Sequence, residues 1–388
     1  TKNNFQNTKL CLKALQMSQN VDFQEIIIVD NGSLDGTREW LRTQADLRVF
    51  MNHTTTGMAA AWNIGAKAAK GDFILFLHND VFVSEHTIQR MCEALQASGD
   101  AGAIGAFTNR CRYRSPYYLK MDYQDFDELR KAVAYEESVI PLQTHALILE
   151  SYCLLMRKSV YKEIGDFDEQ FNVVGCEDVD YSFRLQQHGY KLYIAGTYAY
   201  HDRSSFASNH LEQEPVYQQE KAKFTQKWGT DPQYSTYIRK NFLSKMELKK
   251  ENLTVLEVGC ACGGNLMTIS AMNPGADLYG IEINPHTASV ASCYAQVEAE
   301  DIETISRKDW QGKFDYIIAA DVIEHLHDPW KAVKNLGRFL KLDGKIFISV
   351  PNVLFVGNMY NMLQGEWRYM DAGILDRTHL RFFTRRSI

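Results

Sequence analysis

The stretch Gly71–Val83, GDFILFLHNDVFV, decides the fold of the first half of the chain. Within it, Phe73–Leu77 is an apolar run too short for a helix, which predicts a buried strand of a parallel sheet. The strand stops at His78-Asn79-Asp80. Open α/β sheets bind ligands at the carboxyl ends of their strands, and a carboxylate there suits Mg²⁺ or Mn²⁺. Asp80 is therefore a candidate metal ligand, although taken alone it fits a cap of the next helix better.

The composition limits the classes of function. The chain has 388 residues, enough for two or three domains, and its 42 basic and 48 acidic residues give a net charge of −6. This balance, without a basic cluster, argues against nucleic acid as the main partner. No apolar run approaches the roughly 20 residues that span a bilayer, and no signal peptide opens the chain. Eight scattered cysteines indicate reduced thiols, and Cys260 and Cys262 lack the second pair of a zinc site. These features predict a cytoplasmic protein and leave peripheral contact with the inner face of a membrane open.

Further strands and helices alternate along the first half. The run Gln24–Val29 predicts a second buried strand, and Asp30 follows it in a segment rich in turn-forming residues. The predicted helix Gly57–Ala69 is rich in small residues, so that backbone near Asn63 could approach a ligand closely; close helix packing explains it equally well. The remaining elements are helices over Thr8–Ser18 and Arg38–Gln44 and a strand over Leu47–Asn52. This alternation predicts a parallel α/β sheet.

Taken together, these segments resemble the family-2 glycosyltransferases of the GT-A fold. The resemblance covers most of Thr1–His201 and is carried by IIIVDNGSLDGT (Ile26–Thr37), Asn52 with Gly57, Asn63-Ile64-Gly65, GDFILFLHND (Gly71–Asp80), GDFDEQF and GCEDVDYSFRL. It implies an inverting transferase with a divalent metal (Mg²⁺ or Mn²⁺) and a nucleotide-sugar donor, such as a UDP-, dTDP- or GDP-sugar. On this resemblance Asp30 contacts the nucleotide base, Asn63 lies at the donor, and Asp80 is the metal-binding end of an Asp-x-Asp motif. His78 replaces the first acid of that motif, which leaves the affinity and the choice of metal open.

The motif EDVD at residues 177–180 opens a predicted helix that ends near Gly189. Acids in a first helical turn commonly cap free N–H groups and offset the macrodipole. An inverting transfer also needs a base, and the resemblance gives this role to Asp178, with Glu177 oriented toward the acceptor. His201 follows a predicted short strand, Lys191–Ile194, and a predicted turn at Tyr198–Tyr200. The same resemblance makes His201 a second metal ligand, although a lone histidine is usually structural.

Three expectations concern the limits of this domain. The chain begins where the first strand of the family would have ended, so the resemblance predicts a truncated domain. The segment Arg110–Ser138 is predicted to be an acceptor-side insertion or loop with a helix over Asp125–Glu136; a solvated helix without a ligand role is the more cautious interpretation. The charged segment Asn241–Asn252 is poor in core residues and sets the predicted boundary between domains 1–240 and 241–388.

The strand pattern restarts after residue 253. Strand Thr254–Val258 is followed by a small-residue turn, and the next predicted strand, Leu278–Ile281, ends at Glu282. Such a turn, followed by an acid that binds ribose hydroxyls, is a nucleoside-binding arrangement. By itself it does not separate NAD from S-adenosylmethionine. Further strands are predicted over Phe314–Ala319 and Lys345–Val350.

Residues 253–388 resemble the class I S-adenosylmethionine-dependent methyltransferases. The resemblance rests on the spacing Glu-x-Gly-x-x-x-Gly at residues 257–263 and on VIEHLHDP at residues 322–329. The implied cofactor residues are Glu257, Gly259 and Gly263 at the methionine end, Glu282 at the ribose, Asp301 at the adenine and Asp321 at the mouth of the site. Glu324 and His325 are also expected at the mouth, where His325 is a candidate general base and helix capping is the alternative for the acids. The chain stops before the last strands of such folds, so this domain too is expected to be truncated.

The sequence therefore predicts an α/β protein with a GT-A nucleotide-sugar-binding domain followed by a Rossmann-like methyltransferase domain. The predicted function is inverting transfer of a sugar to a glycan or lipid-linked oligosaccharide, together with methyl transfer from S-adenosylmethionine, in surface polysaccharide biosynthesis. Two alternatives stay open: a scaffold that binds a nucleotide sugar or glycan without turnover, and an enzyme in which only methylation occurs. The sequence leaves open the sugar, the acceptor, the methylated position and the oligomeric state.

Overall fold

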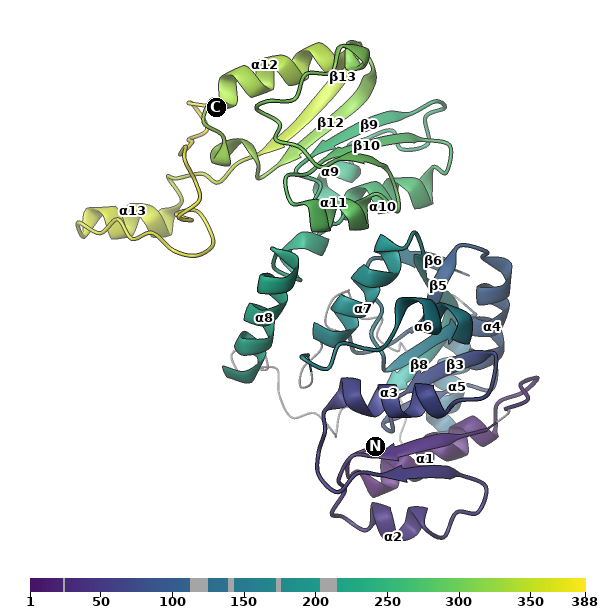
Figure 1. Ribbon diagram of the computed structural model, residues 1–388. Helices are drawn as coiled ribbons and strands as arrows, with labels where there is room; N and C mark the ends of the chain where they lie inside the picture. Colours follow the sequence, from purple (N-terminus) through teal and green to yellow (C-terminus); the bar gives the residue numbers. More distant parts are fainter. Residues whose placement is uncertain (24, 112–124, 139–142, 172–175, 203–214) are drawn as a thin grey trace. The chain divides into compact units, whose positions relative to one another are not determined.

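The computed structural model divides into two compact units, Thr1–Tyr234 and Ser235–Ile388 (Figure 1). It describes residues 1–388 apart from residue 24 and the segments 112–124, 139–142, 172–175 and 203–214. Much of the predicted acceptor-side insertion therefore lies outside the described residues. Each unit combines strands with flanking helices, which confirms the predicted α/β class.

A six-stranded mixed sheet forms the centre of the first unit, with the strand order β3-β7-β5-β8-β4 and with β6 paired to β8. Its strands are β3 (Phe73–Leu77), β4 (Val81–Val83), β5 (Ala101–Phe107), β6 (Gln143–Ala146), β7 (Cys153–Arg157) and β8 (Lys191–His201). Strands β1 (Ile27–Asp30) and β2 (Arg48–Met51) make a separate parallel pair. That pair is the strand–helix–strand unit that the alternation of elements predicts.

The strand that precedes Asp80 has the predicted bounds, but the prediction of parallel pairing was wrong. Along its whole length, β3 runs antiparallel to β7. The pairing continues beyond β3, where the His78 backbone N–H donates to the Tyr152 carbonyl at 3.0 Å. An apolar run indicates that a strand is buried, whereas the direction of its neighbour depends on where the chain returns to the sheet.

Strand β8 is longer than predicted. The sequence suggested a short strand over Lys191–Ile194 and then a turn at Tyr198–Tyr200, but β8 continues without interruption to His201. Its first part pairs with β5 and β6, and its last residues pair antiparallel with β4. In that register Val81 lies opposite His201, which places the end of β8 beside the turn that holds Asp80.

Helices cover both faces of the first sheet (Figure 1). The helices are α1 (Phe5–Gln16), α2 (Thr37–Leu41), α3 (Met58–Ala68), α4 (Thr87–Ala97), α5 (Phe126–Glu137), α6 (Lys158–Ile164), α7 (Cys176–Gln187) and α8 (Pro215–Trp228). One apolar core contains residues of α1, α4 and α5, and a second contains residues of α3, α6 and α7. Helix α8 packs on α7, where the Trp228 and Phe183 rings lie edge to face at 5.1 Å.

The second unit is built on a five-stranded parallel sheet with the order β11-β10-β9-β12-β13. Its elements are α9 (Lys240–Leu243), β9 (Thr254–Val258), α10 (Gly264–Met272), β10 (Asp277–Ile281), α11 (Pro285–Ala291), β11 (Gln296–Glu298), β12 (Phe314–Ala320), α12 (Pro329–Phe339), β13 (Leu340–Ser349) and α13 (Val356–Leu363). Helices α10 and α11 pack on one face and α12 on the other (Figure 1). The strand order reverses between β9 and β12, and ligands bind at the carboxyl ends of strands at such a point.

The predicted linker segment Asn241–Asn252 lies in the second unit. Four of its apolar side chains are buried and join the core under β9, namely Phe242, Leu243, Met246 and Leu248. The high charge of the segment suggested a linker. Its charged side chains are interspersed with apolar side chains that point into the core, so the composition alone did not reveal the core residues.

None of the helices in the described parts of the chain is long and apolar enough to cross a lipid bilayer.

Candidate functional sites

Three side chains that can bind metal meet at one end of the first sheet. Asp80 Oδ1 lies 4.0 Å from His78 Nδ1 and 3.4 Å from His201 Nε2. Ligand atoms of the three residues all lie within 4.8 Å of one another. His78 and Asp80 follow β3, and His201 ends β8, so the β4–β8 pairing brings them together. The sequence predicted Asp80 and His201 as metal ligands. His78 was not predicted as a ligand, because it replaces the first acid of the Asp-x-Asp motif.

Aromatic rings hold both histidines in place. Trp62 stacks on His78 with 5.7 Å between ring centroids, and Tyr152 stacks on His201 at 5.5 Å. His78 Nε2 and both ring nitrogens of His201 are buried and make no hydrogen bond to a described residue. Burial, which outweighs the opposite effect of Asp80, lowers the pKa of His78 to about 4. Its imidazole is therefore neutral near pH 7, the form that coordinates metal, so these residues fit a divalent cation.

The predicted base Asp178 is buried in the first turn of α7. Its Oδ1 accepts a hydrogen bond from the Ser151 backbone N–H at 3.1 Å. The Ser151 hydroxyl accepts one from the Trp62 indole N–H at 3.0 Å, and Tyr152 stacks on His201. Asp178 is therefore joined to the His78–Asp80–His201 cluster through Trp62 and Ser151. Neither of these two was predicted as a site residue.

The acids at the start of α7 have different surroundings. Asp180 is fully buried and accepts a hydrogen bond from the Trp228 indole N–H at 2.9 Å. It also pairs with Arg184 Nε at 2.9 Å and with Lys227 Nζ at 2.6 Å. Asp180 therefore holds α8 against α7. Glu177 is 4% exposed and directly precedes Asp178. The chemical roles expected for Glu177 and Asp178 stay predictions.

The side chain of Asn63 is occupied by protein groups. Its Oδ1 accepts from the Phe167 backbone N–H and the Tyr161 hydroxyl, and its Nδ2 donates to the Phe167 carbonyl and to Glu169. These bonds use all four hydrogen-bonding positions of the amide. Asn63 therefore fixes the 166–169 loop on α3, and the predicted approach of the backbone near Asn63 to a donor stays a prediction.

Asp30 is fully buried at the end of β1. Arg38 Nε lies 2.6 Å from its Oδ2, and the Ser33 backbone N–H donates to its carboxylate at 3.3 Å. The carboxylate thereby orders the turn between β1 and α2. Its predicted contact with a nucleotide base stays a prediction.

In the second unit, the turn after β9 has the backbone that the glycine pattern predicts. Gly259 and Gly263 have φ values of +64° and +77°, a region that disfavours side chains. A Cβ on Gly259 would also lie 2.5 Å from Val322 Cγ2. Ala261 adopts φ +47° as well, and its N–H donates to Glu282 Oε2 at 2.8 Å. The end of β10 therefore holds the turn through the acid predicted to bind ribose.

Two other predicted acids line the same end of the sheet. Glu257 Oε1 accepts from Asn265 Nδ2 at 2.6 Å, while its Oε2 is buried without a hydrogen-bond partner among the described residues. Burial raises the pKa of Glu257 to about 8. Asp321 pairs with Arg239 and accepts from the Ser349 hydroxyl at 2.7 Å. Arg239, which the sequence did not single out, also donates its backbone N–H to Asn265 Oδ1 at 2.7 Å.

Asp301 lies farther along, after β11, and its carboxylate accepts from the Glu303 N–H at 2.9 Å. The contact therefore stabilises the turn that begins at Asp301, and the adenine role of this residue stays a prediction.

Glu324 and His325 follow β12 in the 3-10 helix η4 (Ile323–His325), and His379 joins them. Ligand atoms of the three residues lie within 4.8 Å of one another. Burial raises the pKa of Glu324 to about 7 and lowers that of His325, for which the neighbouring His379 ring is the second cause. His379 lay in no recognisable motif, so the sequence missed it.

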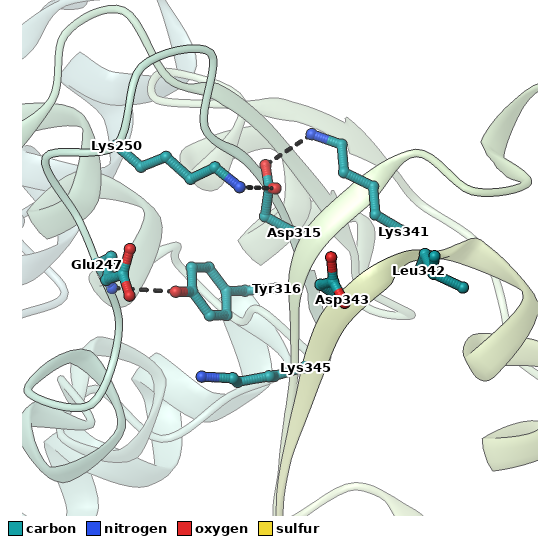
Figure 2. A pocket seen from close by; sticks show the side chains of 9 residues that line it. Glu247, Lys250, Asp315, Tyr316, Lys341, Leu342, Asp343 and Lys345 are labelled. Carbon is teal, nitrogen blue, oxygen red and sulfur yellow. Dashed lines mark hydrogen bonds and ion pairs between the residues drawn. The ribbon is translucent and has the colours of Figure 1, made fainter.

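A surface pocket opens at the opposite, amino-terminal end of β12 and β13 (Figure 2). The Asp315 carboxylate is held by Lys250 at 2.5 Å and Lys341 at 2.8 Å, and the Thr254 backbone N–H donates to it at 2.9 Å. The Tyr316 hydroxyl accepts from the Glu247 N–H at 3.1 Å. These contacts tie the segment before β9 to the sheet. Lys250 and Lys341 therefore have a structural role at Asp315, and their presence in the pocket does not require a bound ligand.

Two family models match the chain, each over one unit. The glycosyl transferase family 2 model matches residues 1–165, and the methyltransferase domain model matches residues 231–388. The chain joins a family 2 glycosyltransferase domain to a methyltransferase domain. The resemblances found in the sequence are thus confirmed for both halves, and the two units are called below the glycosyltransferase unit and the methyltransferase unit.

Individual relatives match single parts of the chain. A ubiquinone biosynthesis O-methyltransferase of Coxiella burnetii is 32% identical over 120 residues, which are 29% of this chain and 50% of that protein. Its counterpart in Xanthomonas oryzae is 30% identical over 105 residues, which are 25% of this chain and 43% of that protein. The chain spans about half the length of the curated relatives it matches. A mannosyltransferase of Pyrobaculum calidifontis, in complex with GDP-Man and Mn²⁺, is 17% identical with a TM-score of 0.41, over 58% of this chain and 62% of that one.

Proposed function

We propose that the glycosyltransferase unit transfers a sugar, with inversion, from a nucleotide-sugar donor to a glycan, and that the methyltransferase unit methylates that glycan. The observation that carries the proposal is the His78–Asp80–His201 cluster, joined through Ser151 to Asp178. The cluster has a donor set that suits a divalent cation, and its contacts lead to a buried carboxylate, which supports the metal and base roles proposed here. A glycan or lipid-linked oligosaccharide acceptor in surface polysaccharide biosynthesis suits this pair of activities.

In the glycosyltransferase unit, His78, Asp80 and His201 would hold the divalent cation. Two imidazoles with one carboxylate suit Mn²⁺ better than Mg²⁺, which prefers oxygen ligands alone. When bound, the cation would offset the charge of the departing diphosphate. Asp178 takes the proton of the acceptor hydroxyl as that oxygen attacks the anomeric carbon, and Glu177 orients the acceptor. The Ser151 N–H fixes one oxygen of Asp178 and thereby directs the carboxylate.

In the methyltransferase unit, Glu282 would bind the ribose hydroxyls of S-adenosylmethionine, and Glu257 would face the methionine end. The sulfonium already activates the methyl group, so the protein mainly aligns the acceptor and excludes water. The positive-φ turn from Gly259 to Gly263 lets the backbone approach the cofactor closely.

Replacing Glu282 by alanine tests the cofactor site. We expect Glu282→Ala to weaken S-adenosylmethionine binding by about 10- to 100-fold, because hydrogen bonds to a charged group contribute roughly 1.5–3 kcal/mol. Sugar transfer should not change. Isothermal titration calorimetry measures the affinity, and exposed Glu251 supplies the matched control, Glu251→Ala. Equal affinity in wild type and Glu282→Ala would contradict the ribose assignment.

A labelled methyl donor tests the coupling of the two activities. A shared chain raises the concentration of one unit's product near the other, which helps most when the two act in sequence. We therefore expect label from S-adenosylmethionine on a hydroxyl of the glycan, either of the newly added sugar or of its neighbour. The full chain is given the glycan acceptor before and after glycosylation, with a panel of nucleotide sugars.

Label found only on protein or on a small metabolite would refute the coupling and leave the separate activities standing. Donor binding without transfer, for every sugar and acceptor in the panel, would favour the scaffold alternative. Methylation without any sugar transfer would favour an enzyme in which only the second unit is active.

A further inference from the structure

The methyltransferase unit holds a group of metal-binding side chains that the proposed function leaves unused. Glu324 and His325 come from η4, and His379 comes from the segment that follows α13. The His325 and His379 rings cross at 78° with their centroids 4.7 Å apart. We infer that Glu324, His325 and His379 bind a divalent cation such as Zn²⁺ or Mn²⁺, which takes an oxygen of the methyl acceptor.

The Glu324 carboxylate is buried and its hydrogen-bonding capacity is not used by other described residues. Glu324 is 1% exposed, and neither carboxylate oxygen makes a hydrogen bond to another described residue. A buried carboxylate in this position is costly unless a cation or a proton neutralises it. The backbone places the histidine beside it, because the Leu380 and Arg381 N–H groups donate to the Glu324 carbonyl at 2.8 and 2.9 Å.

Nδ1 of each histidine lies near a backbone carbonyl oxygen, an arrangement that is common for metal-binding histidines. His325 Nδ1 lies 3.3 Å from the Thr378 carbonyl, and His379 Nδ1 lies 3.0 Å from the Ile374 carbonyl. A carbonyl oxygen only accepts hydrogen bonds, and the Thr378 hydroxyl, which also lies 3.2 Å from His325 Nδ1, donates to Asp376 Oδ1 at 2.7 Å. The tautomer that satisfies these contacts has the proton on Nδ1 of each ring and leaves the lone pair on Nε2. Metal-binding histidines commonly donate their second ring N–H to a backbone carbonyl in this way.

The cluster lies at the carboxyl end of β12, where Asp321 pairs with Arg239. Two imidazoles and one carboxylate leave coordination positions open, as in catalytic zinc sites. An acceptor hydroxyl bound there loses its proton to solvent more readily. Its oxygen then bonds to the methyl carbon while the carbon–sulfur bond breaks, which turns the sulfonium into a neutral thioether. His325 thus becomes a ligand in place of the predicted base. This role rests on the proposed methyl transfer, whereas cation binding does not.

Metal binding by the full-length chain tests the site. The chain is stripped with chelator, titrated with Zn²⁺ and desalted, and the bound metal per chain is measured. Glu324→Gln and His379→Ala should each lose one bound ion relative to wild type. His201→Ala should lose the separate ion of the glycosyltransferase unit. Titration with Co²⁺, followed by its visible absorption bands, should show the same losses spectroscopically.

Exposed His327, two residues from His325, supplies the matched control, and His327→Ala should bind metal as wild type does. Melting temperature and S-adenosylmethionine affinity should stay near wild type in Glu324→Gln, which preserves the shape of the side chain. Wild-type metal content and affinity in both Glu324→Gln and His379→Ala would overturn the site. Metal binding as expected, with no glycan methylated by the loaded chain, would uphold the site and refute the proposed methyl transfer.

Discussion

Asp178→Asn is expected to lower the rate of glycosyl transfer by about 10²–10⁴-fold, the usual effect of losing a general base. Asparagine keeps an oxygen that can accept the Ser151 N–H, so α7 and its neighbours should stay in place. Binding of the nucleotide sugar should survive, because Asp178 is not among the residues that fit the metal. Steady-state kinetics with calorimetry of donor binding separates the two effects. Transfer within a factor of about two of wild type would remove Asp178 from the mechanism.

Asp180→Asn supplies the contrast on the same helix. Asp180 pairs with Arg184 and Lys227, and breaking a buried ion pair commonly costs about 3–5 kcal/mol of stability. We expect this variant to melt at a lower temperature while its folded fraction retains transfer. A rate loss in Asp180→Asn as large as that in Asp178→Asn would mean that the position of α7, rather than a proton acceptor, limits the rate.

The sequence located the strand ends at which the proposed site residues lie. Glu282 and Asp321 stand directly after apolar runs and Asp80 stands three residues after one, and short-range patterns of this kind locate strand ends well. The hydrogen-bond partners of the polar residues were harder to predict from the sequence. Asn63 and Asp30 are polar residues next to glycines or turns, which suggested ligand contact; their side chains bind protein groups, and the contacts with a donor stay predictions. A pattern of residue types does not reveal which hydrogen bonds the fold has already used.

Long-range pairing explains what the sequence could not show. The antiparallel neighbour of β3 comes from residues 153–157, and the end of β8 reaches Asp80 only because β4 pairs with it. His78 was weighed against the metal because a motif position held the wrong residue type. In three dimensions His78 lies in the same cluster as Asp80 and His201 and is a third candidate ligand. His379 lies near Glu324 because the backbone N–H groups of Leu380 and Arg381 donate hydrogen bonds to the Glu324 carbonyl. No local sequence motif predicts such a long-range contact.

Asp80→Ala is expected to weaken Mn²⁺-dependent binding of the nucleotide sugar more than His201→Ala does. Asp80 supplies the carboxylate of the cluster and lies between the two rings, at 4.0 Å from His78 and 3.4 Å from His201. Its loss leaves two imidazoles without an anionic ligand, whereas loss of His201 leaves a carboxylate and an imidazole. Residues that merely support a ligand cost about 10- to 100-fold in metal affinity, so loss of Asp80 itself should cost more than about 100-fold.

Calorimetry of donor binding with and without Mn²⁺ measures both variants. Asp72 precedes the same strand at its other end and is exposed, so Asp72→Ala is the matched control and should bind as wild type does. Which of the two variants, Asp80→Ala or His201→Ala, loses more donor affinity matters as much as the size of each loss. A greater loss in His201→Ala than in Asp80→Ala would mean that nitrogen ligands, rather than the carboxylate, dominate the site. If chelator leaves donor binding and transfer unchanged in wild type, the cluster has no metal role, and His78 and Asp80 serve only the fold.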